Sequence, residues 1–143
     1  MHKRHKHDIL VVLSLIGFAV SVYLATAHYL GYTPPCTVTK GCEEVLTSKY
    51  AYIFGLPLSV WGIVFYTGII IASLLANHYR IWRKLLTLGL GLGAIAAVVF
   101  ILLQFFVIKH VCQYCLITDF LAVILFIWDL NIEHRPYLPQ EAV

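Results

Sequence analysis

The fold is decided by the stretch LLTLGLGLGAIAAVVFILLQFFV, residues 85–107, in which no side chain carries a charge. A helix needs about 20 apolar residues to cross the roughly 30 Å hydrocarbon core of a bilayer, and this stretch is long enough. Residues 57–76 and 9–30 form similar apolar runs, and residues 115–130 form a shorter fourth run. Because backbone groups in lipid must be satisfied within their own segment, each run predicts a transmembrane helix.

The composition is typical of a membrane protein. Of the 143 residues, 61% are hydrophobic and 12% are charged, and the mean hydropathy is +0.86. A soluble globular domain has about 45–50% apolar and about 25% charged residues. The formal net charge of +3 is small and its basic residues are scattered, which argues against nucleic-acid binding. We therefore expect one all-α domain over residues 1–143, a four-helix transmembrane bundle in a lipid bilayer.

The basic residues predict how the bundle is oriented. One side of the predicted spans carries Lys3, Arg4, Lys6, Arg80, Arg83, Lys84 and Arg135, and the other carries Lys40, Lys49 and Lys109. Because Lys and Arg gather on the cytoplasmic side, both termini are predicted to be cytoplasmic. Residues 31–56 and 108–114 then face outward, and so do all four cysteines. Disulfides form and persist on that side of a cell membrane.

Cys112-Gln113-Tyr114-Cys115 opens the fourth run. Residues three apart share a helix face, and the start of a helix favours a reactive thiolate. The motif therefore predicts a redox-active pair. A static disulfide and a zinc site are the alternatives. Zinc needs about four ligands, and His110 is the one extra candidate close by, so we expect no metal.

Cys36 and Cys42 lie in the predicted outer loop. From Cys42 to Ile53, apolar residues recur at helical spacing, which predicts a short amphipathic helix on the membrane surface. Two cysteine pairs at one face suggest a relay, in which oxidation passes between sulfurs by thiol–disulfide exchange. A disulfide that only ties the loop is the alternative. A relay needs a terminal acceptor, and a quinone held inside the bundle is the obvious candidate.

Four polar side chains lie near the outer ends of the spans: His28, Ser59, Gln104 and Asp119. Ionisable groups inside a membrane are costly and usually mark a functional cavity. Asp119 follows Cys115 by one helical turn and would donate a hydrogen bond or a proton to a quinone oxygen. The alternatives are interfacial solvation for His28 and interhelical hydrogen bonding for Gln104. Eight aromatic residues are candidate walls of a quinone pocket: Tyr52, Phe54, Trp61, Phe65, Tyr66, Phe100, Phe105 and Phe106.

Together these features resemble the vitamin K epoxide reductase family. The resemblance rests on the two loop cysteines, FGLPLSVWGIVFY at residues 54–66, FFV at 105–107 and CQYC at 112–115, and it covers roughly residues 19–127. It implies a bundle around a quinone, which would be ubiquinone, menaquinone or vitamin K. Cys115 would lie next to the quinone, Cys42 would attack its disulfide partner Cys112, and Cys36 would exchange with an extracytoplasmic thioredoxin-like protein. We expect the quinone to contact Leu46, Leu58, Ser59, Tyr66, Gln104, Ile108 and Asp119.

Two positions depart from the family pattern. Animal members of the family hold their substrate with an Asn and a Tyr at the positions that look equivalent to Leu58 and Asp119. We therefore expect a plain quinone as the acceptor and disulfide-bond formation as the function, with reduction of vitamin K or its epoxide as the alternative. The spacing of the loop cysteines is similar to the microbial branch, in which many members carry a fused thioredoxin-like domain. Because the chain ends soon after its fourth run, we expect a separate redox partner.

Two further functions fit some of these features. One is an unrelated quinone-linked disulfide generator with four spans, although the Cys-x-x-Cys of such proteins usually lies in the first outer loop. The other is a non-enzymatic membrane scaffold with two static disulfides.

Overall fold

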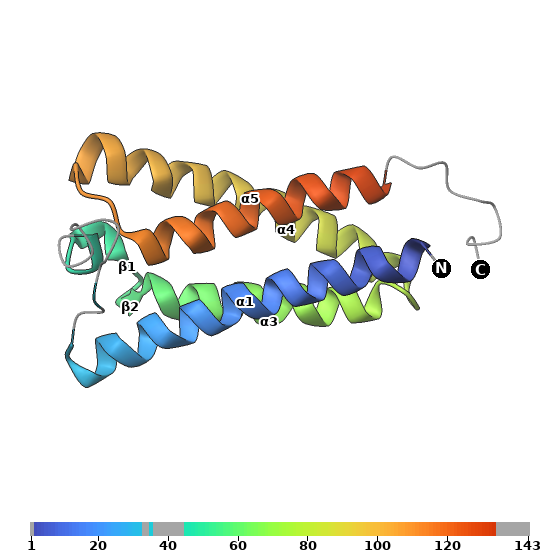
Figure 1. The fold of residues 1–143 in the computed structure, drawn as a ribbon, viewed down its shortest axis with the longest axis horizontal. Coiled ribbons are helices and arrows are strands. Elements are labelled where there is room, and N and C mark those ends of the chain that lie inside the picture. Colours follow the sequence, from blue (N-terminus) through green and yellow to red (C-terminus); the bar gives the residue numbers. More distant parts are fainter. Residues whose placement is uncertain (1, 33–34, 36–44, 134–143) are drawn as a thin grey trace.

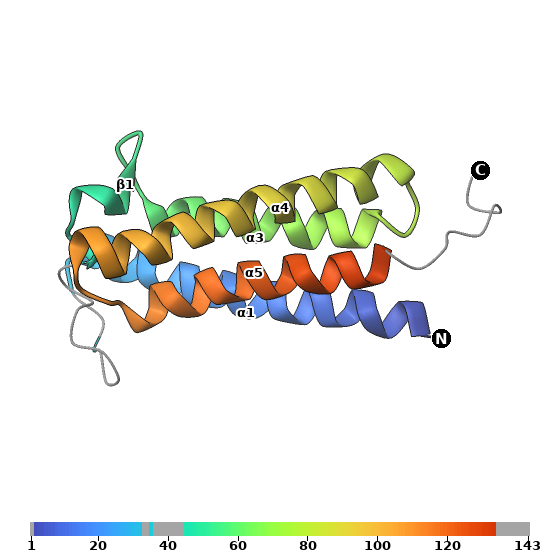
Figure 2. The same ribbon diagram turned by 90° about the horizontal axis from the view of Figure 1, so that it is seen from above.

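A computed structural model describes residues 2–32, 35 and 45–133, with the backbone alone for residues 2–4, 132 and 133. Its long helices are α1 (His2–Leu30), α3 (Leu58–Leu75), α4 (Arg80–Leu102) and α5 (Gln113–Glu133), and α4 continues into the π-helix η2 (Leu103–Ile108). α1 packs against α3 and α5, and α4 packs against the same two helices (Figures 1 and 2). The predicted four-helix bundle is confirmed.

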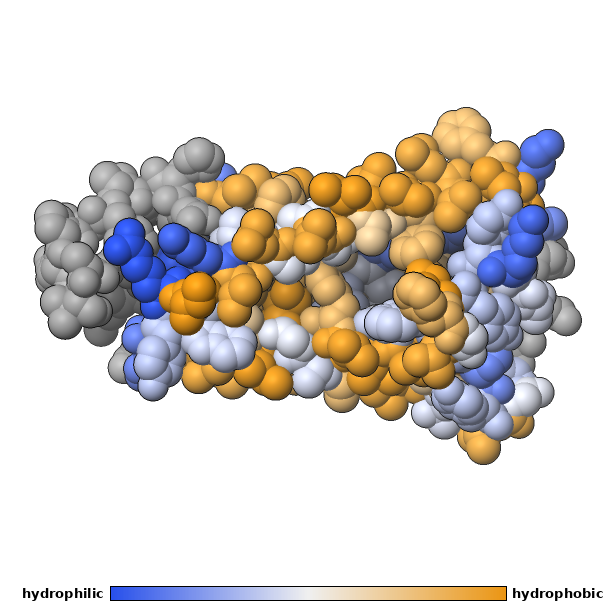
Figure 3. All heavy atoms as spheres, turned by 180° about the vertical axis from the view of Figure 1, so that it is seen from behind, coloured by the Kyte–Doolittle hydropathy of each residue, from blue (hydrophilic) through white to orange (hydrophobic). Residues whose placement is uncertain are grey.

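Within the described residues, four segments are long and apolar enough to cross a membrane: His5–Leu30, Leu58–Leu75, Arg80–Ile108 and Gln113–Asn131. The third and fourth begin a few residues before the predicted runs, because polar residues can extend a helix beyond the hydrocarbon core. On the face that Figure 3 shows, apolar side chains predominate along the bundle and the most hydrophilic ones lie toward its ends. The protein is an integral membrane protein.

The two ends of the bundle differ in content (Figure 1). The basic end contains the start of α1, the end of α5 and the α3–α4 connection, which is followed by Arg80, Arg83 and Lys84. The CxxC end contains the end of α1, the start of α3 and the Cys112–Cys115 motif that opens α5.

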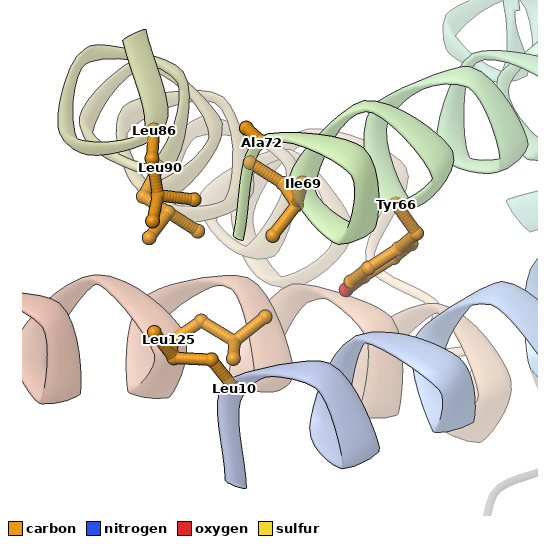
Figure 4. Close-up of a cluster of buried hydrophobic side chains, with 7 residues drawn as sticks. All are labelled: Leu10, Tyr66, Ile69, Ala72, Leu86, Leu90 and Leu125. Atoms are coloured by element: carbon orange, nitrogen blue, oxygen red, sulfur yellow. The ribbon is translucent and has the colours of Figure 1, made fainter. Parts of the chain in front are cut away.

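The core joins all four helices through Leu10, Tyr66, Ile69, Ala72, Leu86, Leu90 and Leu125 (Figure 4). Tyr66 of α3 packs its ring on Gly17 of α1, and its hydroxyl donates a 2.5 Å hydrogen bond to the Thr118 carbonyl of α5. Gly93 of α4 lies in the same way against the ring of Phe65. Small residues at these points let the helices approach closely, as they commonly do in membranes.

Gly17→Ala is expected to destabilise the bundle, because the added Cβ would overlap the Tyr66 ring. Overpacking of this kind typically costs about 1–3 kcal/mol. Gly68→Ala in α3 is the matched control, since no atom lies within 4 Å of its Cβ position and alanine favours helix. Thermal unfolding in detergent should show a lower Tm for Gly17→Ala alone. Equal Tm values for the two variants would contradict this packing.

The structure corrects the amphipathic helix that was predicted in the outer loop. Val45 and Leu46 are helical, but Lys49–Ala51 forms a 3₁₀ turn (η1). Strand β1 (Tyr52–Ile53) then pairs antiparallel with β2 (Leu56–Pro57), so the amphipathic helix does not reach Ile53. The reason is the turn between the strands, where Phe54 and Gly55 have φ values of 52° and 77°. Two positive φ values are typical of a type I′ hairpin, which a helix cannot include.

Candidate active site at the CxxC end

A cavity of about 590 Å³ lies between the helices at the CxxC end. Residues of α1, α3, α4, η2 and α5 form its walls, together with residues 45–54. This volume is in the range of about 300–1,000 Å³ that small-molecule sites occupy. Most of the lining is apolar or aromatic, and its polar groups include His28, Ser59, Gln104, Cys115 and Asp119.

The cavity brings together every residue for which the sequence predicted a quinone contact: Leu46, Leu58, Ser59, Tyr66, Gln104, Ile108 and Asp119. Six of the eight candidate wall aromatics also line it. The other two, Phe105 and Phe106, are 52% and 72% exposed and face outward from η2. Contact between any of these residues and a quinone stays a prediction, but the residues that line the cavity do share one space.

The two cysteines of the CxxC motif have different surroundings. Cys112 is the N-cap of α5, because its carbonyl accepts the Leu116 N–H at 3.0 Å. Its side chain is fully buried and packs against Val45 of the outer loop. Cys115, one turn into the helix, lines the cavity. Both are free thiols, and of the two only Cys115 lines the cavity.

Hydrogen bonds to its sulfur lower the pKa of Cys112. The largest effect is the hydrogen bond from the Cys115 thiol, burial opposes it, the N–H groups of Cys115 and Tyr114 add to it, and the net pKa is about 7. A side-chain acceptor at an N-cap normally receives these N–H groups. A free cysteine has a pKa of about 8.5, so at neutral pH Cys112 is far richer in thiolate than an ordinary cysteine.

This effect predicts a pH titration. In a Cys36→Ser/Cys42→Ser background, the ultraviolet absorbance of thiolate should rise through about pH 7 as Cys112 loses its proton. Adding Cys115→Ala removes the thiol donor and should move this rise to higher pH. Adding Cys115→Ser instead keeps a hydroxyl donor and should largely preserve it. A rise near pH 8.5 in the parent would refute the effect, since about 8.5 is the unperturbed value.

Gln104 links the CxxC motif to Asp119. Its side-chain oxygen accepts the Cys112 backbone N–H at 2.9 Å, and its side-chain nitrogen lies 3.4 Å from Asp119 Oδ2 as a donor. The interhelical hydrogen bonding considered for Gln104 is therefore present, and it involves two candidate site residues.

Cys36 and Cys42 lie outside the described residues, but residues near them in sequence contact the CxxC motif. Tyr114 donates a 2.7 Å hydrogen bond from its hydroxyl to the Pro35 carbonyl, directly before Cys36. Val45, three residues after Cys42, packs on Cys112. The outer loop is thus attached to the motif on both sides of its cysteine pair.

Sequence reasoning missed some of the site. Thr118 and Ala122 line the cavity three and seven residues after Cys115, and this helical spacing was a signal that could have identified them. The contacts of Pro35 and Val45 had no such signal, because they join segments far apart in sequence. Among the described residues, which exclude the two loop cysteines, no group of three or more His, Cys, Asp or Glu could hold a metal ion.

The comparison with known families agrees with this geometry. The model of the vitamin K epoxide reductase family matches residues 8–130, which include both cysteine pairs and nearly all of the four helices.

Proposed function

Because the chain belongs to the vitamin K epoxide reductase family, we propose that it oxidises a dithiol protein outside the cytoplasm and reduces a quinone in the membrane. Family membership makes it an integral membrane oxidoreductase of a quinone-linked kind. The partner protein would then pass its new disulfide to exported proteins.

One observation carries the proposal: both cysteines of the CxxC motif lie beside the outer loop, and of the two only Cys115 lines the cavity. Cys115 lines a cavity that opens among apolar and aromatic walls, whereas Cys112 is buried against the outer loop. A pair placed in this way can receive electrons from the loop at one sulfur and release them into the cavity at the other. A static disulfide has no need of such a division.

The contacts of Val45 and Pro35 limit how far the loop cysteines can lie from the CxxC motif. Three residues of fully extended chain span at most about 10–11 Å, so packing of Val45 on Cys112 limits how far Cys42 can be from it. The Tyr114–Pro35 hydrogen bond gives a similar limit for Cys36 at the other end of the loop. These contacts support transfer between the two pairs.

Thiol–disulfide exchange would carry two electrons from the partner to the CxxC motif. The partner's dithiol reduces the Cys36–Cys42 disulfide and leaves as a disulfide. The Cys42 thiolate then attacks the Cys112 sulfur of the Cys112–Cys115 disulfide and releases the Cys115 thiolate. Attack of Cys36 on Cys42 next releases Cys112. A thiol of low pKa leaves fastest, so the lowered pKa of Cys112 favours this step.

The reduced pair then holds two electrons and two protons. These two electrons and two protons would pass to a quinone in the cavity, and the Cys112–Cys115 disulfide would form again. The cavity suits a flat apolar ring because Phe65, Tyr66 and Phe100 are in its walls and polar groups lie beside Cys115. Asp119, one turn from Cys115 and on the same wall, would donate one of these two protons to a quinone oxygen and regain a proton from the thiols.

Leu58 and Asp119 both line the cavity, at the two positions that differ from the animal members of the family. This supports ubiquinone or menaquinone over vitamin K epoxide as the acceptor. Leucine cannot donate or accept a hydrogen bond through its side chain, so this site lacks an amide at that position.

The distribution of charge supports cytoplasmic termini and outward-facing cysteines. Arg80, Arg83 and Lys84 lie at the same end as the start of α1, and the CxxC motif lies at the opposite end. Lysine and arginine accumulate on the cytoplasmic side of membrane proteins.

Cys36→Ser tests the proposed path from the partner. The variant should still reduce a short-chain ubiquinone with dithiothreitol, because a small dithiol can reach the inner pair directly. It should lose reduction by reduced thioredoxin, which needs Cys36. Both rates are followed by quinone absorbance, with the unsubstituted protein as the control. A wild-type chain that reduces no quinone with either reductant would instead be a scaffold with static disulfides.

A further inference from the structure

Gln104 sits at the junction of the CxxC motif and the cavity wall. Its side chain is 2% exposed, although an amide is costly to bury without partners. Both ends of the amide are used: the oxygen accepts the Cys112 N–H at 2.9 Å, and the nitrogen lies 3.4 Å from Asp119 Oδ2. Neither partner belongs to the helix that carries Gln104.

The local backbone explains why Gln104 points inward. The last turns of this span form the π-helix Leu103–Ile108, which ends at Lys109 with a φ of 60°. Within it, Gln104 is buried while Phe105 and Phe106 face outward. π-helical turns inside α-helices occur frequently at functional sites. This turn presents the amide toward the start of α5, where both of its partners lie.

We propose that Gln104 is a positioning residue that holds the Cys112 backbone and the Asp119 carboxyl in one fixed arrangement beside Cys115. The inference rests on the proposed function and deepens it. Gln104 fixes the N-cap residue of α5 and, one helical turn beyond Cys115, the group that would deliver a proton. Misplacement by about 1 Å can lower a rate by about a hundredfold, so this arrangement matters for catalysis.

Two substitutions test the two hydrogen bonds of the Gln104 side chain separately. Gln104→Leu removes both hydrogen bonds. Gln104→Glu keeps an oxygen that can accept the Cys112 N–H, but an ionised carboxylate cannot donate to Asp119. When the introduced carboxyl takes up a proton at low pH, it can again accept and donate, as the native amide does. Gln104→Glu should therefore be rescued by acid, whereas Gln104→Leu should not.

Quinone reduction by dithiothreitol measures these effects with a short-chain ubiquinone. At neutral pH both variants should lose about tenfold or more in kcat, with little change in KM. The kcat of Gln104→Glu should approach that of the wild type as the pH falls. Other titratable groups that line the cavity, including His28, Tyr66 and Cys115, are present in every protein compared, so the variant-to-wild-type ratio cancels their contribution. Asp119 lies beside the introduced carboxyl and titrates together with it, so the ratio reports the protonation of this pair.

Phe106→Leu is the matched control, because its side chain belongs to the same π-helix but is 72% exposed. It should match the wild type in rate and Tm. A second readout needs no quinone: amide hydrogen exchange of Cys112 should lose protection in Gln104→Leu and keep it in Phe106→Leu. This readout serves even if the Gln104→Leu variant has little activity.

The outcomes are distinct. A wild-type protein that reduces no quinone would overturn the proposed function, while the exchange measurement would still decide whether Gln104 holds Cys112. An active wild type with unchanged kcat and unchanged Cys112 exchange in Gln104→Leu would overturn the positioning role. A raised KM with unchanged kcat and exchange would also overturn it, because Gln104 would then be a ligand contact only.

Discussion

Cys115→Ala is expected to abolish quinone reduction. Cys115 is the sulfur of the motif that lines the cavity, whereas Cys112 is buried against the loop. Without Cys115, the inner pair can neither form its disulfide nor bring a thiol to the cavity. Loss of a residue that takes part directly in bond making can cost about a millionfold in rate, so we expect at most about a thousandth of the wild-type kcat. The loss of quinone absorbance, with dithiothreitol as the reductant, measures kcat.

Ile117→Ala is the control for this substitution, because Ile117 lies in the same turn of α5 and is 43% exposed. It should retain wild-type turnover. If Cys115→Ala turned over quinone as fast as this control, the cavity sulfur would have no role in the reaction, and the assigned electron path would be wrong.

Asp119→Asn has the second largest expected effect. Asparagine matches aspartic acid in size and can still accept the hydrogen bond from Gln104, but it has no acidic proton to deliver. General acid catalysis contributes about 10²–10⁴-fold, and kcat for quinone reduction should fall within that range. Formation of the Cys112–Cys115 disulfide by a chemical oxidant should be unaffected, since that reaction needs no proton from Asp119.

The same helix offers a matched control. Asp129 is also buried in α5, where it accepts a 2.7 Å hydrogen bond from Thr87, but it does not line the cavity. Asp129→Asn should therefore leave kcat near that of the wild type once corrected for any loss of folded protein. Equal losses of corrected kcat in the two variants would show that the effect is not specific to the cavity and would remove the role of Asp119 as a proton donor.

The sequence predicts the helices well because length and hydropathy decide them. Residues 85–107 are apolar enough that lipid leaves the chain no alternative to a helix. The structure of the outer loop was harder to predict. Apolar residues from Cys42 to Ile53 follow a helical period, but the positive φ values of Phe54 and Gly55 end that pattern in a hairpin. Such a turn depends on local backbone geometry that periodicity does not report.

The cavity residues also include some that the sequence could identify and some that it could not. Asp119 could be placed beside Cys115 from spacing alone, because residues four apart share a helix face. The hydrogen bonds of Gln104 could not be predicted, since they depend on a π-helical turn and on the distance between two helices. The outward orientation of Phe105 and Phe106 follows from the same turn. Sequence spacing therefore identified residues on one element better than contacts between elements.

The central claim is that electrons pass from the loop pair to the CxxC motif through a bond between Cys42 and Cys112. Cys36→Ser/Cys115→Ser leaves these two as the only cysteines of the chain. In lipid nanodiscs under mild oxidation, mass spectrometry of the digested protein should find them joined in most molecules. Cys42→Ser/Cys115→Ser, which leaves Cys36 and Cys112, should join far less. Free thiols at Cys42 and Cys112, or equal joining in the two variants, would contradict the account.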